Sequence, residues 1–569
     1  MSKTSLEDIK TSSHGLRGRI AEDLGDGSDR VGADSAQLLK FHGIYQQDDR
    51  DQRADRRRDG RDKAWSFMLR SRLPGGRLTP DAWLAHDRIA DAHGGGRLRI
   101  TSRQGLQLHG VLKDDLRPAL AELDRALVSS LGACGDVVRN VTCCPLPASS
   151  RLRDELDEVT DALADRFALR TRAHRAIWLD GEKQDEVSPG DDDTYGAAYL
   201  PRKFKLGIAP PDDNCIDAWT QDLGLLATTR GGRVDGFDVL VGGGLGAKHG
   251  KDHAVPRLGL PLGWVSREEV VDLVAAVVSF HRDHGDRDDR SRARLKFLVH
   301  GLGLDVVRQE VRRRFAGRLH PSHGAAPRPR HLHLGWHAQD DGSWALGLPV
   351  DGGRIRDDGS QRLKTALAVA TAELGLEVRL TPSHDLLLLG IDDDRRRRVD
   401  ELLDAHGVRR AEESTPLRNA AMACPALPTC GLALAEAERV LPTLVHALED
   451  ELASLGLGEQ PLDFRITGCP NGCARPYVAE LALVGRSKDR YVVHVAGGPA
   501  GDRLTEELWD GVPTDEVVPR LRPLFRSWAE ERRDHERFGD WCHRVGVDAL
   551  RTLSDAALAV SADTTGGAS

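Results

Sequence analysis

The segment LRITSRQGLQLHGV at residues 98–111 decides the fold, because it returns later in the chain as VRLTPSHDLLLLGI at residues 378–391. In both copies, apolar residues recur two positions apart, which is typical of strands that bury one face. Each copy therefore predicts β-structure, and an offset of roughly 280 residues separates the two copies.

Two further echoes keep nearly the same offset. The string LPGGRL at residues 73–78 returns as PVDGGRI at 349–355, and RNVTCCPLP at 139–147 returns as RNAAMACPALP at 418–428. Chance matches between short strings are common, but three at one offset indicate gene duplication. Each half is expected to contain a strand–helix–strand unit followed by a larger α/β unit.

Four of the nine cysteines lie in two tight clusters. Cys424 and Cys430 form a C-x5-C pair, and Cys469 and Cys473 form a C-x3-C pair. Prolines and glycines beside them place both pairs in turns. Thiols that converge from loops are what a soft, thiolate-bound metal centre needs, because its ligands must meet at one point and be deprotonated.

Other interpretations compete for these cysteines. Disulfides are disfavoured, because the chain shows no secretory signal and no transmembrane run, so the reducing cytoplasm is expected. Structural zinc remains an alternative, although zinc modules mostly use C-x2-4-C spacing. Inert buried thiols would not cluster in this way. The spacing alone therefore favours an iron–sulfur cluster over zinc.

Composition sets broad limits on function. The 569 residues are too many for one hydrophobic core, so about three domains are expected. The contents of 40% hydrophobic and 30% charged residues are those of a globular protein, and the net charge of −9 is mild. This balance gives no support to a nucleic-acid or membrane partner, and we expect neither.

Two lysines stand close together in YLPRKFK at residues 199–205. If this stretch is a strand, Lys203 and Lys205 project from one face while Phe204 points into the core. Two like charges side by side cost energy unless an anion lies between them, so the pair suggests an oxyanion site. A solvated strand face is the alternative that the lysines alone leave open.

The glycine-rich run VGGGLGAKHG at residues 241–250 contains G-x-G-x-x-A, a weak match to a dinucleotide-binding fingerprint. Lys248 follows where the helix of that motif should begin. We interpret Gly242, Gly243 and Gly244 instead as a loop of backbone N–H donors near an anionic group, since glycine lets the backbone approach closely.

With these residues in place, the chain resembles the assimilatory sulfite and nitrite reductases, and most closely the sulfite reductase haemoprotein (beta) subunits. The C-x5-C…GCPNGC arrangement carries the resemblance, which extends over nearly the whole chain. It implies that all four clustered cysteines bind a [4Fe–4S] cluster, and that Cys473 also bridges to the iron of sirohaem as its axial ligand.

The resemblance also implies an α+β fold with three lobes, built from an internal duplication with pseudo-two-fold symmetry. The expected segments are an N-terminal arm (1–60), a first ferredoxin-like half-domain (61–148), an α/β domain for sirohaem and substrate (149–328), a second ferredoxin-like half-domain (329–420) and an α/β domain for the [4Fe–4S] cluster and sirohaem (421–569).

The same resemblance assigns cations to the substrate. LPRKFK is similar to the family segment whose two lysines contact substrate, and ferredoxin-dependent nitrite reductases have Asn at the position of Lys205. A second cation suits dianionic sulfite better than monoanionic nitrite. Arg70 and Arg139 match two arginines that complete the site with Lys203, and a guanidinium is a permanently charged donor for oxyanions.

Further residues are assigned by resemblance to the carboxylates of sirohaem: Arg99, Arg103, Gln104, Gly242, Gly243, Gly244, Arg294 and Lys296. Some relatives carry a covalent Tyr–Cys link beside sirohaem, and Tyr45 and Cys134 match its positions. The remaining cysteines are interpreted as structural thiols: Cys143, Cys144, Cys215 and Cys542.

The predicted activity is the six-electron reduction of sulfite to sulfide, with reduction of nitrite to ammonia by the same cofactors as the alternative. The sequence shows no convincing flavin or NADPH module. Electrons are therefore expected from another protein, either a diflavin NADPH reductase subunit or a ferredoxin. A zinc-stabilised, non-catalytic binding protein is the rival from a different class.

Overall fold

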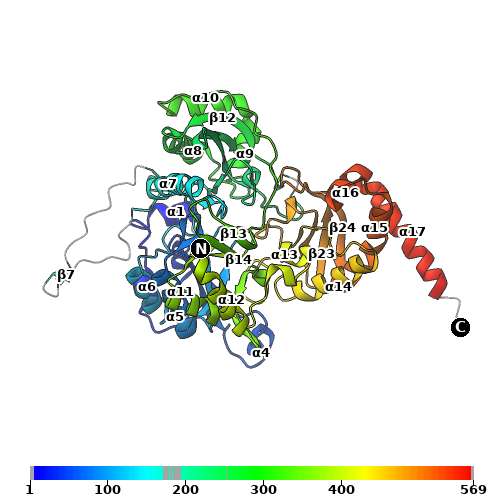
Figure 1. Ribbon diagram of the computed structural model, residues 1–569. Coiled ribbons are helices and arrows are strands. Elements are labelled where there is room, and N and C mark those ends of the chain that lie inside the picture. The colour runs from blue at the N-terminus through cyan, green and yellow to red at the C-terminus, as the bar shows by residue number, and fades with distance from the viewer. Residues whose placement is uncertain (1–4, 171–177, 180–181, 184–193, 252, 566–569) are drawn as a thin grey trace.

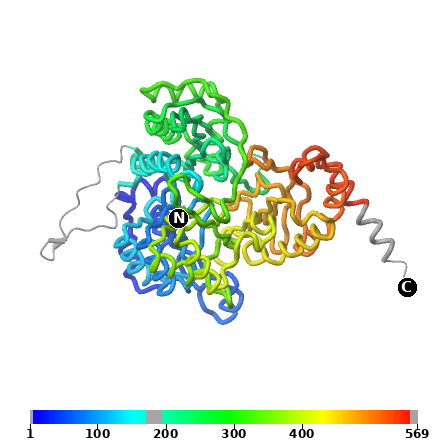
Figure 2. The backbone as a smooth tube through the Cα atoms, in the orientation of Figure 1, coloured from blue at the N-terminus to red at the C-terminus, as the bar shows by residue number. Residues whose placement is uncertain are grey.

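The computed structural model describes residues 5–170, 178–179, 182–183, 194–251 and 253–565, and the chain forms three lobes (Figure 1). One lobe mixes blue with yellow-green segments, so early and late parts of the chain fold together there (Figure 2). The green lobe and the yellow-to-red lobe are each built mainly from one stretch of chain. Each lobe has its own large hydrophobic core.

The mixed lobe contains two five-stranded antiparallel sheets, one for each half of the duplication. Their strand orders are β1-β2-β5-β4-β15 and β13-β14-β19-β18-β3. The strands are β1 (Ile44–Asp48), β2 (Trp65–Arg70), β3 (Arg77–Leu78), β4 (Leu98–Ile100), β5 (Leu106–Val111), β13 (Gly335–Ala338), β14 (Trp344–Leu348), β15 (Arg354–Ile355), β18 (Glu377–Leu380) and β19 (Leu386–Ile391). The helices are α5 (Pro80–His93), α6 (Leu116–Arg125), α11 (Leu363–Leu374) and α12 (Arg396–Ala405).

Each of these sheets ends in a strand from the other half of the chain. β15 pairs with β4, and β3 pairs with β18. The exchanged strands are the GGR echoes of the sequence. A β-carbon on Gly76 would lie 2.5 Å from the carbonyl oxygen of Leu380, and one on Gly353 would lie 2.8 Å from that of Ile100, so both approaches require glycine. The exchange confirms the predicted duplication and its pseudo-two-fold symmetry.

The other two lobes repeat one sheet topology. Each sheet is parallel over its last three strands and antiparallel over the rest, in the orders β12-β11-β10-β9-β6 and β24-β23-β22-β21-β20. Parallel strands bring their carboxyl ends to one edge, where loops can meet. The strands are β6 (Thr142–Cys143), β9 (Leu206–Ala209), β10 (Leu223–Arg230), β11 (Arg233–Val241), β12 (Leu260–Ser266), β20 (Met422–Ala423), β21 (Phe464–Thr467), β22 (Leu481–Ser487), β23 (Arg490–Val495) and β24 (Glu506–Pro513).

Helices complete the lobes and the N-terminal segment. They are α1 (Leu6–Thr11), α2 (Ile20–Leu24), α3 (Ala33–Leu38), α4 (Arg53–Arg58), α7 (Ser150–Arg166), α8 (Val270–His284), α9 (Leu295–Leu302), α10 (Leu304–Arg314), α13 (Pro416–Ala420), α14 (Leu441–Ser454), α15 (Val517–Glu531), α16 (Phe538–Val545) and α17 (Val547–Thr565). Two short strand pairs remain, β7 (Trp178–Leu179) with β8 (Glu182–Lys183), and β16 (Asp357–Asp358) with β17 (Gln361–Arg362). Among the described helices, none combines the length and the apolar character needed to cross a membrane.

Candidate redox centre and cation cluster

The four clustered cysteines come together at one sheet edge. Cys424 directly follows β20, while Cys469 and Cys473 follow β21, which runs parallel to β20. The backbone N–H of Gly468 donates a hydrogen bond to the sulfur of Cys424 at 3.3 Å. Cys430 lies on the loop that leaves Cys424. Two loops of the third lobe therefore carry all four thiols.

Their pKa values show that the four sulfurs are electrostatic neighbours. Burial, and then the sulfur of Cys473, raise the pKa of Cys424 above its usual range and that of Cys469 to about 12. The same two causes raise the pKa of Cys430. The raised pKa values favour the protonated form of these three thiols in the metal-free protein, and a bound cationic centre would deprotonate them.

The four sulfurs are not gathered as closely as the ligands of a single ion. No three of them, all in the described part of the chain, lie within 4.8 Å of one another. Sulfur ligands of one tetrahedral zinc ion would lie roughly 3.8 Å apart, given bonds of about 2.3 Å. Thiolates are also the ligands of iron–sulfur clusters, in which each cysteine binds a different iron.

Residues of the first half hold the cysteine loops in place. Arg50 donates to the carbonyl oxygens of Cys430 at 3.1 Å and Ala433 at 2.6 Å. The hydroxyl of Ser102 donates to the carbonyl oxygen of Cys473 at 2.9 Å. The thiols of the second half are thus positioned partly by the first.

Arg99, predicted to bind a carboxylate of sirohaem, also holds a cysteine loop. Its side chain is 1% exposed, donates to the carbonyl oxygen of Ala423 at 2.7 Å and forms an ion pair with Glu438. These contacts fix the residue that precedes Cys424. A contact between Arg99 and sirohaem stays a prediction.

Lys203 and Lys205 flank a fully buried phenylalanine. Phe204 pairs with Val138 in an isolated parallel bridge just before β9, so the alternation expected of a strand is present. Both lysines are half-buried, and neither ammonium group has a hydrogen bond or ion pair within the described residues. Two unpaired cations side by side form a site for an anion.

Burial and neighbouring cations disfavour both ammonium forms. The pKa of Lys203 lies well below its usual range through burial and then through Arg202 and Lys205. The pKa of Lys205 is lowered to about 7 by burial and then by Arg103 and Arg294. A bound anion would raise both pKa values, because it would stabilise the charged forms.

Arg70 is a third predicted substrate cation, and it shares Cys473 as an electrostatic neighbour with Lys205. It ends β2, lies over the ring of Tyr45 with 6.0 Å to the ring centroid, and donates to the sulfur of Cys134 at 2.9 Å. Burial lowers its pKa, but Cys134, Tyr45 and Cys473 together raise it above its ordinary value. Tyr45 and Cys134 are therefore neighbours, and the covalent link between them stays a prediction.

Arg139 is the fourth predicted substrate cation. Its backbone N–H donates to the carbonyl oxygen of Phe204 at 2.9 Å. Its charge lowers the pKa of Lys203. We call the four predicted substrate cations, Arg70, Arg139, Lys203 and Lys205, the cation cluster. Cys473 is an electrostatic neighbour of this cluster, because it raises the pKa of both Arg70 and Lys205.

Arg103 supplies an unpaired donor beside the cation cluster. Its Nη atoms donate to Gln221 at 2.8 Å and to the carbonyl oxygen of Leu206 at 2.9 Å. Its Nε is buried and has no partner in the part of the chain that the structure describes. Burial, and then Arg139, lower its pKa to about 9. A carboxylate of a bound macrocycle would satisfy this donor.

Gln104, in contrast, has its amide group fully occupied. Its Nε2 donates to the carbonyl oxygens of Gly75 at 3.1 Å, Cys143 at 2.8 Å and Leu380 at 2.9 Å. Its Oε1 accepts the backbone N–H of Cys143 at 2.9 Å. Gln104 therefore joins the two halves of the chain, and its predicted contact with sirohaem stays a prediction.

Two cations support the glycine loop. Lys296 donates to the carbonyl oxygens of Gly244 at 3.1 Å and Gly246 at 2.7 Å. Arg294 forms a two-point ion pair with Asp222 at 2.7 and 3.0 Å. β-Carbons at three positions would collide with neighbours: Gly242, Gly243 and Gly244. No helix begins between residues 245 and 269 in the described chain, so the loop is not a dinucleotide-binding fingerprint.

Asp222→Asn is expected to destabilise the fold by about 3–5 kcal/mol, because it leaves buried Arg294 without its counter-charge. Asp222 is fully buried and also accepts the backbone N–H of Lys205 at 2.8 Å. The free energy of unfolding in denaturant measures the effect. Asp510→Asn is the control, since it removes an exposed pair with Arg486 worth about 0.2–1 kcal/mol. Equal losses in the two variants would contradict a structural role for Asp222.

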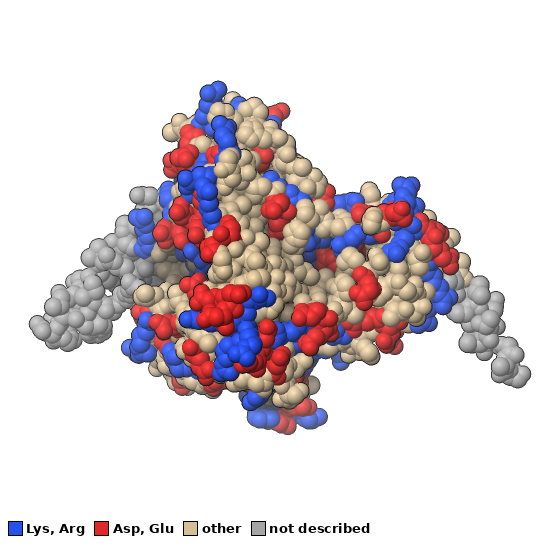
Figure 3. Space-filling view, viewed as in Figure 1, with Lys and Arg blue, Asp and Glu red and all other residues tan. Residues whose placement is uncertain are grey.

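Exposed charges of both signs are interspersed over the surface of the lobes (Figure 3).

Sequence reasoning missed four residues that hold the site: Arg50, Ser102, Asp222 and Glu438. Ser102 lies inside the repeated segment at residues 98–111, and that placement was a usable signal. Arg50 stands in a mixed-charge run, where most side chains are solvated, so its contact with the cysteine loop had no local signal. Asp222 and Glu438 also had no local signal, because each is an isolated acidic residue in a chain that is rich in acidic residues.

These features define a class of redox protein in which thiols suited to an iron–sulfur cluster adjoin cations suited to an oxyanion, on a duplicated fold. Residues 134–319 and 415–560 match the nitrite and sulphite reductase 4Fe-4S domain. Residues 58–126 and 337–406 match the nitrite/sulfite reductase ferredoxin-like half domain. The chain therefore belongs to the nitrite and sulfite reductase family.

Individual relatives are similar over nearly the full length. The chain is 43% identical over 546 residues to the sulfite reductase (NADPH) hemoprotein beta-component of Myxococcus xanthus, covering 95% of this chain and 96% of the relative. It is 40% identical to the sulfite reductase (ferredoxin) of Synechococcus elongatus, over 97% of this chain and 91% of the relative. The solved structure of Mycobacterium tuberculosis NirA protein superposes with a TM-score of 0.77 at 26% identity, covering 96% of this chain and 97% of that one.

Proposed function

We propose that this protein is the haemoprotein component of an assimilatory sulfite reductase and carries out the six-electron reduction of sulfite to sulfide. The unpaired Lys203 and Lys205 carry the proposal. The charge of Arg139 lowers the pKa of Lys203, and Cys473 is an electrostatic neighbour of both Arg70 and Lys205. Relatives that are named sulfite reductases support it. Because a dianion needs more positive charge than a monoanion, the cluster favours sulfite over nitrite.

The residues present fit the two cofactors that the family implies. Four thiols would hold the [4Fe–4S] cluster: Cys424, Cys430, Cys469 and Cys473. Cys473 would also ligate the sirohaem iron, and the unpaired Nε of Arg103 suits a carboxylate of the macrocycle. When bound, these cofactors supply the multi-electron redox chemistry that side chains lack.

The cation cluster binds and orients the substrate in this proposal. Arg70 and Arg139 keep their charge at working pH and hold the oxyanion through its oxygens. Lys203 and Lys205 neutralise the remaining charge. With its pKa lowered to about 7, Lys205 can also give a proton to an oxygen that leaves as water and take up another.

Electrons would come from a separate protein, either an NADPH-dependent flavoprotein or a ferredoxin. Similar relatives carry names of both kinds, so both donors remain candidates. The protein would act in the reducing cytoplasm, where thiols persist.

Anaerobic turnover with reduced methyl viologen tests the function on protein replete with iron and sirohaem. The catalytic efficiency, kcat/KM, is compared for sulfite and nitrite. We expect sulfite to be well ahead. If nitrite is well ahead, the lysine pair does not set specificity and the protein is a nitrite reductase on the same fold. A colourless protein without iron would overturn both assignments.

The efficiency of sulfite reduction is expected to fall as pH rises through about 7. Lys205 has a lowered pKa of about 7, so its ammonium group, which binds the anion, is lost above that pH in the free protein. The measurement is log kcat/KM against pH. Nitrite serves as a second substrate, because its charge is constant over this range. Lys205→Arg should move the break above pH 8, since Arg stays protonated. If the pH at which kcat/KM falls is unchanged in Lys205→Arg, the titration belongs to another group.

A further inference from the structure

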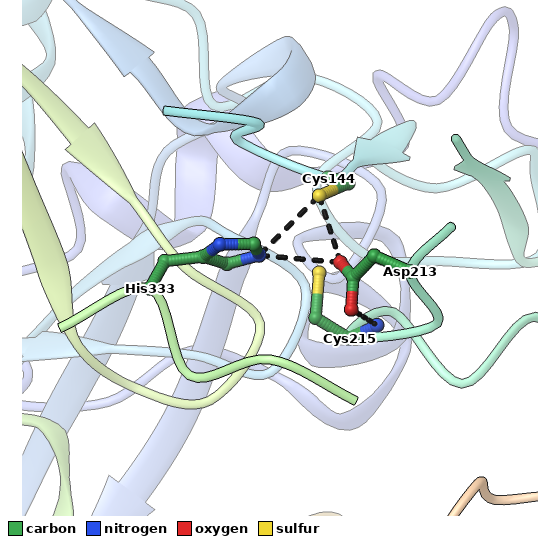
Figure 4. A group of neighbouring side chains, drawn as sticks. All are labelled: Cys144, Asp213, Cys215 and His333. Carbon is green, nitrogen blue, oxygen red and sulfur yellow. Dashed lines mark hydrogen bonds and ion pairs between the residues drawn. The ribbon is translucent and has the colours of Figure 1, made fainter. Parts of the chain in front are cut away.

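A second group of metal-ligating side chains lies apart from the four clustered cysteines. Cys144, Asp213, Cys215 and His333 are all buried, and one ligand atom of each lies within 4.8 Å of the others (Figure 4). In the described residues, no other group of three or more such side chains is gathered so closely. We propose that these four residues bind one structural Zn²⁺ ion.

Three separate segments contribute the four residues. Cys144 directly follows β6, and Asp213 and Cys215 lie on the loop after β9. His333 stands just before β13, on the connection that enters the second ferredoxin-like sheet. An ion held by all four would therefore fasten this connection to the sheet of the green lobe.

The donor set is one that zinc prefers. Two thiolates, one imidazole and one carboxylate match its borderline-soft character, and four protein ligands without an open position are typical of structural sites. The sulfur of Cys144 lies 2.9 Å from Asp213 Oδ2 and 3.4 Å from His333 Nε2, and the last two atoms are 3.2 Å apart. Ligand atoms around tetrahedral zinc lie roughly 3.3–3.8 Å apart for bonds of about 2.0–2.3 Å. Shifts of a few tenths of an ångström would accommodate the ion.

The surrounding backbone orients the ligands toward one point. Asp213 Oδ1 accepts the backbone N–H groups of Cys215 at 3.1 Å and His331 at 2.9 Å, which leaves Oδ2 for the metal. His333 has a left-handed φ of +61°, a conformation that directs its ring and is uncommon outside glycine. Outer contacts of this kind fix metal ligands in place.

Two buried arginines hold the backbone that carries the cysteines. Arg475 donates to the carbonyl oxygen of Cys215 at 2.8 Å, and Arg379 approaches that of Cys144 at 3.5 Å. Arg475 is also paired with Asp217 and Arg379 with Asp157, so both guanidinium groups have counter-charges of their own. Their contacts with the carbonyl groups fix the positions of the two thiols.

A metal-free alternative must be distinguished from the zinc site. Burial raises the pKa of Cys144 and Cys215, so in the absence of metal both thiols are protonated, and Cys144 can donate to Asp213. Zinc would displace these protons, as it does from other coordinating thiols. A disulfide between Cys144 and Cys215 is a second alternative to zinc.

The experiment measures zinc, iron and sirohaem in the same preparation of full-length protein, expressed with zinc in the medium and analysed by inductively coupled plasma mass spectrometry. We expect about one zinc per chain in the wild type. Cys144→Ser and Cys215→Ser should lose it. Cys143→Ser is the matched control, because Cys143 is equally buried and adjacent but outside the group, and it should keep the zinc.

If the serine variants do not fold, measurements on the wild type alone still test whether the four residues bind zinc. X-ray absorption at the zinc edge should report two sulfur and two nitrogen or oxygen ligands. Iron-replete protein that holds no zinc, even after equilibration with Zn²⁺, would overturn the proposal. So would zinc retained in Cys144→Ser, or an intact mass two hydrogens low that maps to a Cys144–Cys215 disulfide. Zinc content is independent of turnover, so this result stands apart from the proposed activity.

Discussion

Cys473→Ser is expected to lower sulfite turnover with reduced methyl viologen by at least about 1000-fold. The three other clustered thiols share Cys473 as an electrostatic neighbour, and so do Arg70 and Lys205, so this residue stands where the thiols meet the cation cluster. Serine has nearly the same size, but its oxygen is a harder ligand that remains protonated and binds iron weakly.

The measurement combines turnover with iron content and the visible absorption of sirohaem. Loss of turnover together with altered absorption is the expected result. Cys542→Ser is the control, because Cys542 is fully buried but belongs to neither group of metal-ligating cysteines. That variant should keep its iron and its turnover, although a buried hydroxyl costs about 1–3 kcal/mol of stability. Full activity in Cys473→Ser would remove this residue from the redox centre.

Lys205→Asn is expected to reduce kcat/KM for sulfite by about 100-fold and for nitrite by less than about 10-fold. The ammonium group of Lys205 has no partner among the described residues, so its charge is available to an anion. A doubly charged substrate loses more Coulomb energy than a singly charged one when one cation is removed. Steady-state kinetics on both substrates in one preparation give the ratio.

Two companion variants separate charge from structure. Lys488→Asn removes an exposed lysine and should leave both efficiencies unchanged. Lys205→Arg keeps the charge and should retain most of the preference for sulfite. Equal losses on the two substrates in Lys205→Asn would mean that the residue supports binding in general and does not select the substrate.

Much of this architecture could be predicted from sequence, because its signals are local strings. The repeated segments report duplication without any knowledge of contacts, and cysteine spacing reports a metal centre. The exchange of β3 and β15 had no such signal. The GGR echoes identify equivalent positions, but nothing local says that Arg77 pairs with Arg379 in the other half of the chain.

The sequence predicted which types of residue belong to the candidate site better than it predicted what each residue contacts there. The resemblance assigned Arg99 and Gln104 to sirohaem, and the structure shows that both also make contacts within the protein, with Glu438 and with backbone carbonyl groups. The chemistry of a side chain determines which partners it can bind, and only the folded structure shows which of those partners it contacts. For Lys203 and Lys205 the sequence suggested an oxyanion site and left a solvated strand face open. The resemblance favoured the first of these, and the structure shows two half-buried lysines whose ammonium groups have no partner among the described residues.

The strand exchange between the two sheets also bears on how this protein originated. A single ancestral half would have lacked the outermost strand of its sheet, and a second identical copy could have supplied it across a two-fold axis. Such an ancestor would have been a homodimer with two equivalent sites. Fusion of its genes would have let the copies diverge, so that the clustered thiols now lie in the second half and the predicted substrate cations in the first. Neither half of the present chain should fold when expressed alone, because the sheet of each half includes an edge strand from the other half: β15 in the first sheet and β3 in the second.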